Sequence, residues 1–318
     1  MTAEPILTAA VLSYDGRELL EVVLPSLAAQ RWQGFRTVVV DNGSSDGTVS
    51  WLRRQWPAVE VVALPENVGV TAALNACLDA AGTELVALLN NDLELHPDCL
   101  WELVAAMREH PRAGSAAAKL LDFYDREVID GAGDVFGWHG LPSRRGHGER
   151  DRGQYERPQE IFGACGAAAI YRREALADVG RFDERFFAFY EDADWAWRAQ
   201  LAGWDCLYVP TAIAYHMGSV TVGGAATDFT SYQLWRNGIW LVAKNYPVAA
   251  LLRRGPRVAH TQLLHLRAAR RERRLAIWRR AMLDAARGLP GALRSRRIAQ
   301  RARRRPMREL DAIVSRDG

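Results

Sequence analysis

Apolar runs and helically spaced apolar residues alternate through the first third of the chain. Runs rich in Val, Leu and Ala predict buried strands at residues 6–12, 37–40, 59–64 and 85–89. Apolar residues spaced along one helix face predict helices at residues 17–30, 48–55, 70–81 and 97–109. Strands and helices that alternate in this way predict an α/β fold built on a doubly wound, mostly parallel sheet.

The second half of the chain departs from this alternation. Residues 122–159 are rich in Gly, Arg and Asp, and we expect loops and short strands there that form a mobile flap. Regular structure is expected again at 161–171 and 173–179, followed by a helix at 192–202 and a strand at 205–209. Beyond Pro247, leucines recur among many arginines and predict an amphipathic helix over 260–287.

Composition narrows the class of protein. The 318 residues are 49% hydrophobic and 25% charged, which is typical of a globular chain that buries a core. The four cysteines lack the spacing of a metal or disulfide framework, which fits a reducing compartment. The N-terminus has no basic, apolar leader and no apolar run is long enough to span a bilayer, so we expect a cytoplasmic protein.

Polar side chains gather where the predicted strands end. Asp41 follows the second strand, Asn67 the third, and Asn90-Asn91-Asp92 the fourth. Because ligands bind beyond the carboxyl ends of parallel strands, these positions predict a nucleotide-type site. The Asp41 carboxylate suits an imide N–H or a ribose hydroxyl, and Asp92 suits Mg²⁺ or Mn²⁺ beside a diphosphate. The residues that follow Asp41 are also typical of a turn and a helix cap.

A second acidic cluster precedes a predicted helix. Glu191, Asp192 and Asp194 lie beside Trp195, and the helix dipole explains one carboxylate there but not three. A carboxylate near a sugar acceptor can take its hydroxyl proton. His216 follows the last predicted strand and is either a structural histidine or a metal ligand.

Charge divides the chain unevenly. Residues 251–318 hold 20 arginines and 5 acidic residues, whereas residues 1–250 hold 21 basic and 33 acidic residues. Such a basic tail is expected to bind an anionic partner. Two alternatives stay open: an interfacial helix on anionic lipid, or a helix packed on the acidic body of the same protein. Nucleic acid is disfavoured because the tail holds few aromatic residues and no known module.

Five motifs in order resemble the inverting family 2 glycosyltransferases, in the rhamnosyltransferase-like and galactofuranosyltransferase-like branch. They are VLSY at 11–14, VVVDNGSSDGT at 38–48, ENVG at 66–69, LNND at 89–92 and EDAD at 191–194. The resemblance covers roughly residues 5–244. It implies a GT-A fold over residues 1–250, with a donor-binding half at about 1–120 and an acceptor side at about 121–250, followed by an Arg-rich helical tail at 251–318.

The resemblance also implies roles for single residues. Tyr14 and Asp41 hold the donor base, while Asn67 and Asn91 lie near the donor. Asn90 and Asp92 stand at the metal motif, and His216 is a second ligand for Mg²⁺ or Mn²⁺. Asp192 is the catalytic base and Glu191 tunes it. The acceptor side is implied to include Asp194, Trp195, Cys165 and Gly166.

Departures from the family pattern refine the expected activity. The metal motif begins with Asn90 instead of Asp, and Gln233-x-x-Arg236 lacks the Trp that follows it in processive synthases. We therefore expect transfer of a single sugar, from dTDP-rhamnose first or a UDP-sugar second, to a cell-envelope saccharide or polyprenyl-linked acceptor. The protein would then work in the cytoplasm or on the inner face of the membrane.

Three other functions compete with that of a glycosyltransferase. A sugar nucleotidyltransferase needs a Gly-rich phosphate loop after the first strand, and a dehydrogenase needs GxGxxG there. Ser13-Tyr14-Asp15-Gly16 fits neither. A catalytically impaired lipid- or nucleic-acid-binding protein on the same scaffold remains the alternative, which the presence of Asp92 and Asp192 disfavours.

Overall fold

The computed structural model describes residues 4–218 and 227–314 and confirms the doubly wound sheet. Its central strands are β1 (Leu7–Ser13), β2 (Phe35–Asp41), β3 (Glu60–Ala63), β4 (Leu85–Asn90), β6 (Ala113–Asp122), β11 (Ala168–Arg172) and β12 (Asp205–His216). Short strands at the margins are β5 (Leu93–Leu95), β7 (Ile129–Gly131) and β10 (Gln159–Ile161).

The sheet has the order β10-β12-β6-β11-β4-β1-β2-β3. β1 pairs in parallel with both β2 and β4, and β12 pairs in parallel with β6. β11 is antiparallel to its neighbours β4 and β6. Within residues 161–171, where regular structure was expected, β10 ends and β11 begins: the two strands lie in different parts of the sheet and are joined by the loop that holds Gly166.

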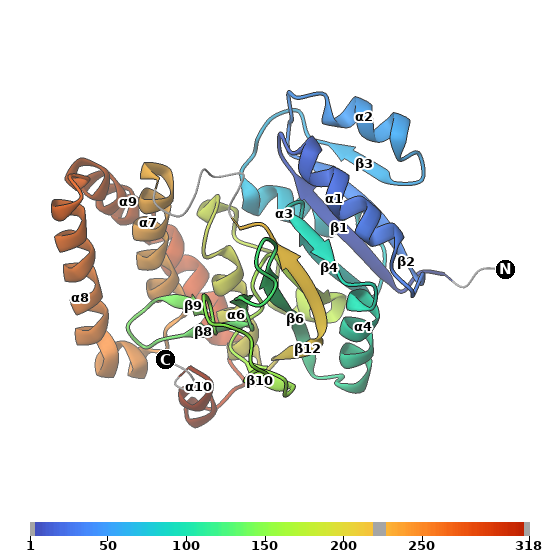
Figure 1. Cartoon of the computed structure of the whole chain (residues 1–318). Helices are drawn as coiled ribbons and strands as arrows, with labels where there is room; N and C mark the ends of the chain where they lie inside the picture. Colours follow the sequence, from blue (N-terminus) through green and yellow to red (C-terminus); the bar gives the residue numbers. More distant parts are fainter. Residues whose placement is uncertain (1–3, 219–226, 315–318) are drawn as a thin grey trace.

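Helices cover both faces of the sheet (Figure 1). They are α1 (Arg17–Ala28), α2 (Thr48–Gln55), α3 (Val70–Ala80), α4 (Cys99–Glu109), α5 (Arg173–Val179) and α6 (Glu191–Ala202), with a 3₁₀ turn η1 (Glu184–Phe186) before α6. Alternate residues of one strand enter opposite cores. In β2, Val39 belongs to the buried cluster that includes α1 and α4, while Val38 and Val40 belong to the cluster that includes α3. This two-sided burial explains the continuous apolar runs of the strands.

The segment expected to be a mobile flap is tied to the sheet. β7 pairs with β6, and β8 (Asp134–Phe136) pairs with β9 (Pro142–Arg144) as a hairpin. Lys119 of β6 is buried and forms ion pairs with Asp151 and Glu156, which anchor the far end of the segment. The short strands are confirmed. These contacts make the segment a wall beside the sheet instead of a free flap.

Residues 227–314 form four more helices: α7 (Asp228–Asn245), α8 (Val248–Arg271), α9 (Leu275–Arg301) and α10 (Met307–Val314). The single helix expected over 260–287 is wrong, because the chain turns between α8 and α9, where Arg273 has a φ of 59°. Ala292 of α9 and Leu310 of α10 share one buried cluster with Trp197 of α6. Two main-chain carbonyls, those of Gln200 and Trp204, accept hydrogen bonds from Arg305. Packing on the protein's own body, one of the two alternatives for the tail, is therefore seen for α9 and α10.

The side chains of α8 are less covered than those of α9. In Figure 1, α8 forms the outer edge of the helical layer, opposite to α2. Within residues 4–218 and 227–314, no helix is both long and apolar enough to cross a bilayer.

Candidate active site

The loops after β1 and β2 interlock beyond the ends of their strands. Asp41 ends β2, and its Oδ2 accepts a hydrogen bond from the Ser44 N–H at 2.9 Å. Asp15 joins the two loops, because its Oδ1 accepts from the Ser45 N–H at 2.7 Å. The other oxygen of Asp41, Oδ1, is buried without a hydrogen-bond partner. This leaves one buried acceptor at the end of β2, next to the end of β1 that leads into the partly buried Tyr14, where a nucleotide base could bind.

Asn67 and Asn91 form hydrogen bonds that hold the loops beyond β1 and β2. Asn67 Oδ1 accepts from the Asn42 side chain at 3.1 Å and from the Gly69 N–H at 3.0 Å. Asn91 Nδ2 donates to Ser13 Oγ at 3.1 Å and would collide with any Cβ at Gly16. Both side chains therefore fix the loops at the ends of β1 and β2, and their place near the donor stays a prediction.

Asp92 and His216 come together from distant parts of the sequence. β12 pairs with β5 so that His216 lies opposite Leu93, beside Asp92. Asp92 Oδ1 and His216 Nε2 are 3.4 Å apart, both are buried, and neither makes a hydrogen bond. Asn90 ends β4 two residues before Asp92. The two atoms form an ion pair when His216 is protonated and have no other partner, so a neutral His216 would leave both free to bind a divalent cation for which a diphosphate supplies further ligands.

Asp130 orients His216 and was missed in the sequence. Its Oδ2 lies 2.8 Å from His216 Nδ1, so the ring presents Nε2 to Asp92. Burial alone would lower the pKa of His216, but the carboxylates of Asp130 and Asp92 outweigh burial and raise this pKa to about 9. Asp130 is itself held by Arg144 of β9, whose Nη1 donates to both carboxylate oxygens at 2.9 and 2.7 Å.

Asp192 lies at the start of α6, against the loop between β10 and β11. Its Oδ2 accepts from the Gly166 N–H at 3.2 Å and its Oδ1 from the Ala193 N–H at 2.7 Å. A Cβ at Gly166 would lie 3.3 Å from Asp192 Oδ2, so a larger residue there would crowd the carboxylate. Cys165 is buried, and burial raises the pKa of its thiol to about 12, so it stays protonated. The structure therefore places Gly166 against Asp192, with Cys165 next to it in the same loop.

The two carboxyls at the start of α6 influence one another. Burial raises the pKa of Asp192, and burial followed by repulsion from Asp192 raises the pKa of Glu191. Glu191 Oε2 is buried without a hydrogen-bond partner. A carboxylate whose pKa is raised above the usual value for Asp is a stronger general base.

This coupling predicts a pH effect. Because a base must be ionised to act, kcat/KM is expected to rise with pH along a limb set by the raised pKa of Asp192. Glu191 has a pKa raised to about 8, so it is uncharged where Asp192 ionises, and Glu191→Gln should leave this limb in place in a pH profile of kcat/KM. A limb that moves clearly to lower pH in Glu191→Gln would show that Glu191 is charged there and would contradict this order of ionisation.

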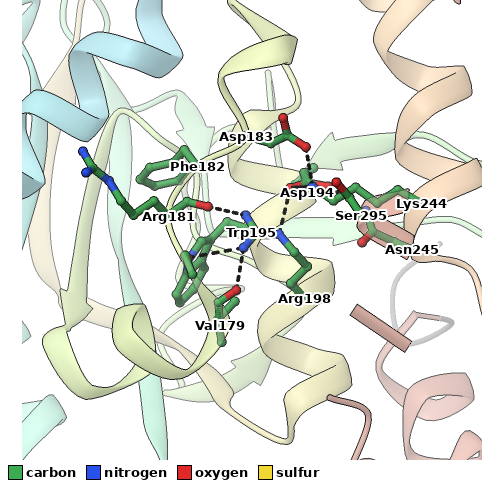
Figure 2. Close-up of polar contacts among 12 residues, drawn as sticks. Val179, Arg181, Phe182, Asp183, Asp194, Trp195, Arg198, Lys244, Asn245 and Ser295 are labelled. Atoms are coloured by element: carbon green, nitrogen blue, oxygen red, sulfur yellow. Dashed lines mark hydrogen bonds and ion pairs between the residues drawn. The ribbon is translucent and has the colours of Figure 1, made fainter. Parts of the chain in front are cut away.

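The structure corrects the acceptor-side prediction for Asp194 and Trp195. Asp194 is fully buried and accepts hydrogen bonds from Arg198, Lys244 and Asn245 (Figure 2). Trp195 packs against Tyr171 in the core, and its Nε1 donates to the Gly180 carbonyl. Both side chains are therefore structural, since neither leaves a polar atom or a ring face for a sugar.

Asp134 is a further residue that sequence reasoning missed. It lies directly across the β8–β9 hairpin from Arg144, so both side chains are on one face. Its Oδ1 is buried without a hydrogen bond, and burial followed by repulsion from Asp192 raises its pKa well above the usual range. Only the β8–β9 pairing, which is not visible in the sequence, brings Asp134 and Arg144 to the site.

The chain belongs to a glycosyltransferase family: residues 8–180 match the family described as Glycosyl transferase family 2. It is therefore a glycosyltransferase.

Curated relatives agree with this class. The chain is 27% identical over 242 residues to N-acetylglucosaminyl-diphospho-decaprenol L-rhamnosyltransferase of Mycobacterium tuberculosis, which covers 69% of this chain and 78% of the relative. It is 30% identical over 193 residues to the pre-mycofactocin glycosyltransferase of the same species, covering 58% of this chain and 38% of that relative.

Solved structures share the fold. The mannosyltransferase PcManGT from Pyrobaculum calidifontis, in complex with GDP-Man and Mn²⁺, matches with a TM-score of 0.58 at 20% identity over 99% of this chain and 85% of that one. TarS of S. aureus matches with a TM-score of 0.60 at 18% identity over 97% of this chain and 55% of that one. These neighbours confirm the GT-A class of fold.

Proposed function

We propose that this glycosyltransferase moves one sugar from a nucleotide-diphosphate sugar to a saccharide acceptor, with inversion and with the help of a divalent cation. The observation that carries the proposal is a pair of buried atoms, Asp92 Oδ1 and His216 Nε2, that face one another and make no hydrogen bond. Asp192 lies on a neighbouring element. The rhamnosyltransferase relative supports dTDP-rhamnose as first donor, ahead of a UDP-sugar, and a polyprenyl-diphosphate-linked saccharide as acceptor.

Asp92 and His216 would hold the cation, with Asn90 beside them. Among the residues that the structure describes, no group of three His, Cys, Asp or Glu side chains could hold a metal ion. The remaining ligands would be donor phosphate oxygens and water. An imidazole ligand favours Mn²⁺ over Mg²⁺, because Mg²⁺ prefers oxygen ligands. Bound there, the cation supplies a Lewis acid that stabilises charge on the leaving diphosphate.

The other residues divide between donor and acceptor. In this proposal Tyr14 and Asp41 bind the donor base, and residues 1–120 form the donor half. Asp192, oriented by the Gly166 N–H, takes the proton of the acceptor hydroxyl from the side of residues 121–250. Attack from the face opposite to the leaving group inverts the anomeric carbon.

A thermal-shift panel tests the donor class. With Mn²⁺, dTDP and UDP and their sugars are expected to raise the melting temperature, because a ligand that binds only the folded state stabilises it. GDP serves as the base control. A well-folded protein that responds to none of them would favour the alternative of a binding protein on this scaffold.

We further propose that α8 places the enzyme on anionic lipid, where a lipid-linked acceptor would be found. Val248, Leu252 and Leu263 share one side of α8 and are 62%, 79% and 43% exposed. The exposed Arg253 and Arg257 lie on the adjoining polar face, about 80° and 120° around the helix from Leu263, and among the described residues neither forms an ion pair with an acidic side chain. An exposed apolar stripe flanked by arginine is typical of an interfacial helix.

Vesicle sedimentation tests the membrane proposal. Reversing both charges with Arg253→Glu and Arg257→Glu is expected to weaken binding to phosphatidylglycerol vesicles by about tenfold or more, since each basic residue near the surface contributes about 1 kcal/mol. The matched control is Arg53→Glu with Arg54→Glu on the exposed side of α2, which should change binding little. Equal loss in both pairs, or equal binding to neutral vesicles, would contradict a specific role for α8.

A further inference from the structure

The segment that leads into Asp192 has an unusual backbone. Phe187 has a φ of 63° and a ψ of −56°, and the Ala188 N–H donates to the Phe186 carbonyl at 2.7 Å. These values describe a γ-turn of the rare hand, which is strained. Phe189 and Tyr190 follow with φ of 67° and 69°, and α6 begins at once with Glu191. We call residues 186–190 the strap.

Helix α7 donates hydrogen bonds to three carbonyl groups of the strap. The Asn237 side chain is fully buried, and its Nδ2 lies 3.0, 2.9 and 2.8 Å from the carbonyl oxygens of Phe186, Ala188 and Phe189. Arg236 Nη2 donates to the Phe186 carbonyl at 2.9 Å, and its Nε donates to Asn237 Oδ1 at 2.9 Å. The arginine thus orients the asparagine while also binding the strap.

The strap contacts the donor side as well. The Phe187 carbonyl accepts from the Thr71 N–H in the first turn of α3 at 3.0 Å. A Cβ at Gly69 would lie 2.5 Å from the Phe187 ring, so the ring packs directly on the loop after β3. All four carbonyls from Phe186 to Phe189 therefore accept hydrogen bonds, three from α7 and one from α3.

The far end of α7 holds α6 itself. Lys244 Nζ lies 2.8 Å from Asp194 Oδ2 and 2.7 Å from Asp183 Oδ2, and Asn245 Nδ2 lies 2.8 Å from Asp194 Oδ1 (Figure 2). These three contacts fix the first turn of α6 and the start of η1. Asp192 thus sits between two parts of the chain that are both held by α7.

Residues in sparsely populated backbone conformations persist only where their surroundings determine them, and they cluster at active sites. We propose that Arg236 and Asn237 are positioning residues that hold the strap so that Asp192 faces the acceptor. This inference rests on the proposed function for the role of Asp192. It also gives a role to the Gln233-x-x-Arg236 sequence, whose Arg236 binds the strap and the Gln233 side chain.

Asn237→Leu tests the proposal, because leucine fills similar space and removes both N–H donors. We expect the amides of residues 187–193 to exchange with solvent about tenfold faster or more, while amides of the central sheet are unchanged. We expect kcat for transfer to fall about 10- to 100-fold, because small misplacements of a catalytic group are costly. The donor KM and the Mn²⁺-dependent affinity for UDP or dTDP should stay within about twofold.

Two more variants keep the test decisive. Arg236→Gln leaves the buried Asn237 in place and should show the same pattern even if Asn237→Leu folds poorly, while Arg236→Lys retains a donor and should restore part of kcat. Gln300→Ala is the control, since it removes a hydrogen bond from α9 to the Asn245 carbonyl without touching the strap. It should leave exchange in residues 187–193 unchanged.

Amide exchange that stays slow in the strap of Asn237→Leu or Arg236→Gln would overturn the proposal. So would a fall in kcat that Gln300→Ala reproduces, because general destabilisation would then explain it. A wild-type protein that transfers no sugar would instead count against the proposed function, and the exchange measurement would still decide whether α7 holds the strap.

Discussion

Asp192→Asn is expected to lower kcat by about 10²- to 10⁴-fold, the usual contribution of a general base. The amide keeps the size of the side chain and can still accept from the Gly166 N–H, but it cannot take a proton. Donor binding should persist, because the pocket around Asp41 and the Asp92–His216 pair are untouched. The measurement is initial-rate kinetics together with calorimetric titration of the nucleotide in the presence of Mn²⁺.

Asp194→Asn is the informative contrast on the same helix. Asp194 is fully buried and pairs with Arg198 and Lys244, so neutralising it should cost stability, about 3–5 kcal/mol for a broken buried ion pair. Asp192→Asn should leave the free energy of unfolding close to that of the wild type. If Asp192→Asn retained near-normal turnover, or if the two variants lost stability equally, the assignment of the base would be wrong.

Asp92→Asn is expected to remove the metal dependence of nucleotide binding and to lower kcat by about 10³-fold, because Lewis-acid stabilisation is worth several kcal/mol. Asp130→Asn should act more mildly, about 10- to 100-fold in Mn²⁺ affinity, since it only orients His216. Both are measured by titrating Mn²⁺ in the presence of nucleotide diphosphate.

Glu94→Gln provides the control for this series. Glu94 lies two residues from Asp92 and pairs with Arg126 at the surface. The Glu94→Gln variant should bind Mn²⁺ as the wild type does. Normal Mn²⁺ affinity in Asp92→Asn would show that the cation is held elsewhere.

The sheet could be predicted because its signal is local. Strands buried on both faces give unbroken apolar runs, and the helices between them keep their periodicity. Asp41 and Asp92 were expected at strand ends for the same reason, whereas the metal role of His216 was implied only by the family resemblance. The structure brings Asp92 and His216 into contact. Asp130 and Arg144 escaped prediction because the pairing of β7 with β6 and of β8 with β9 positions them, and short polar strands carry no clear periodicity.

The acidic cluster shows a second limit of sequence reasoning. Two positions along a helix differ by about 200° in direction, so Asp192 and Asp194 must face different surroundings. Periodicity assigns a buried face only when the other face is polar. Almost every residue of α6 is buried, so its sequence could not tell which carboxylate faces the acceptor and which binds Lys244.

One part of the basic tail packs on the body of the protein, while lipid binding stays a proposal for α8. Arg304 and Arg305 bind main-chain carbonyls of the body, whereas the arginines beside the apolar stripe of α8 face outward. The number of arginines alone does not distinguish these roles, because a guanidinium can donate hydrogen bonds either to a carbonyl oxygen or to a lipid phosphate.

The most direct test of the proposed function is to determine, by NMR, the anomeric configuration of the first product. The wild-type protein is incubated with dTDP-rhamnose and a short prenyl-diphosphate-linked N-acetylglucosamine, with and without Mn²⁺. For metal-dependent transfer with inversion, we expect a glycoside that forms only with the metal and whose anomeric configuration is opposite to that of the donor. A product with retained configuration, or one that forms equally well in the presence of a chelator, would contradict it.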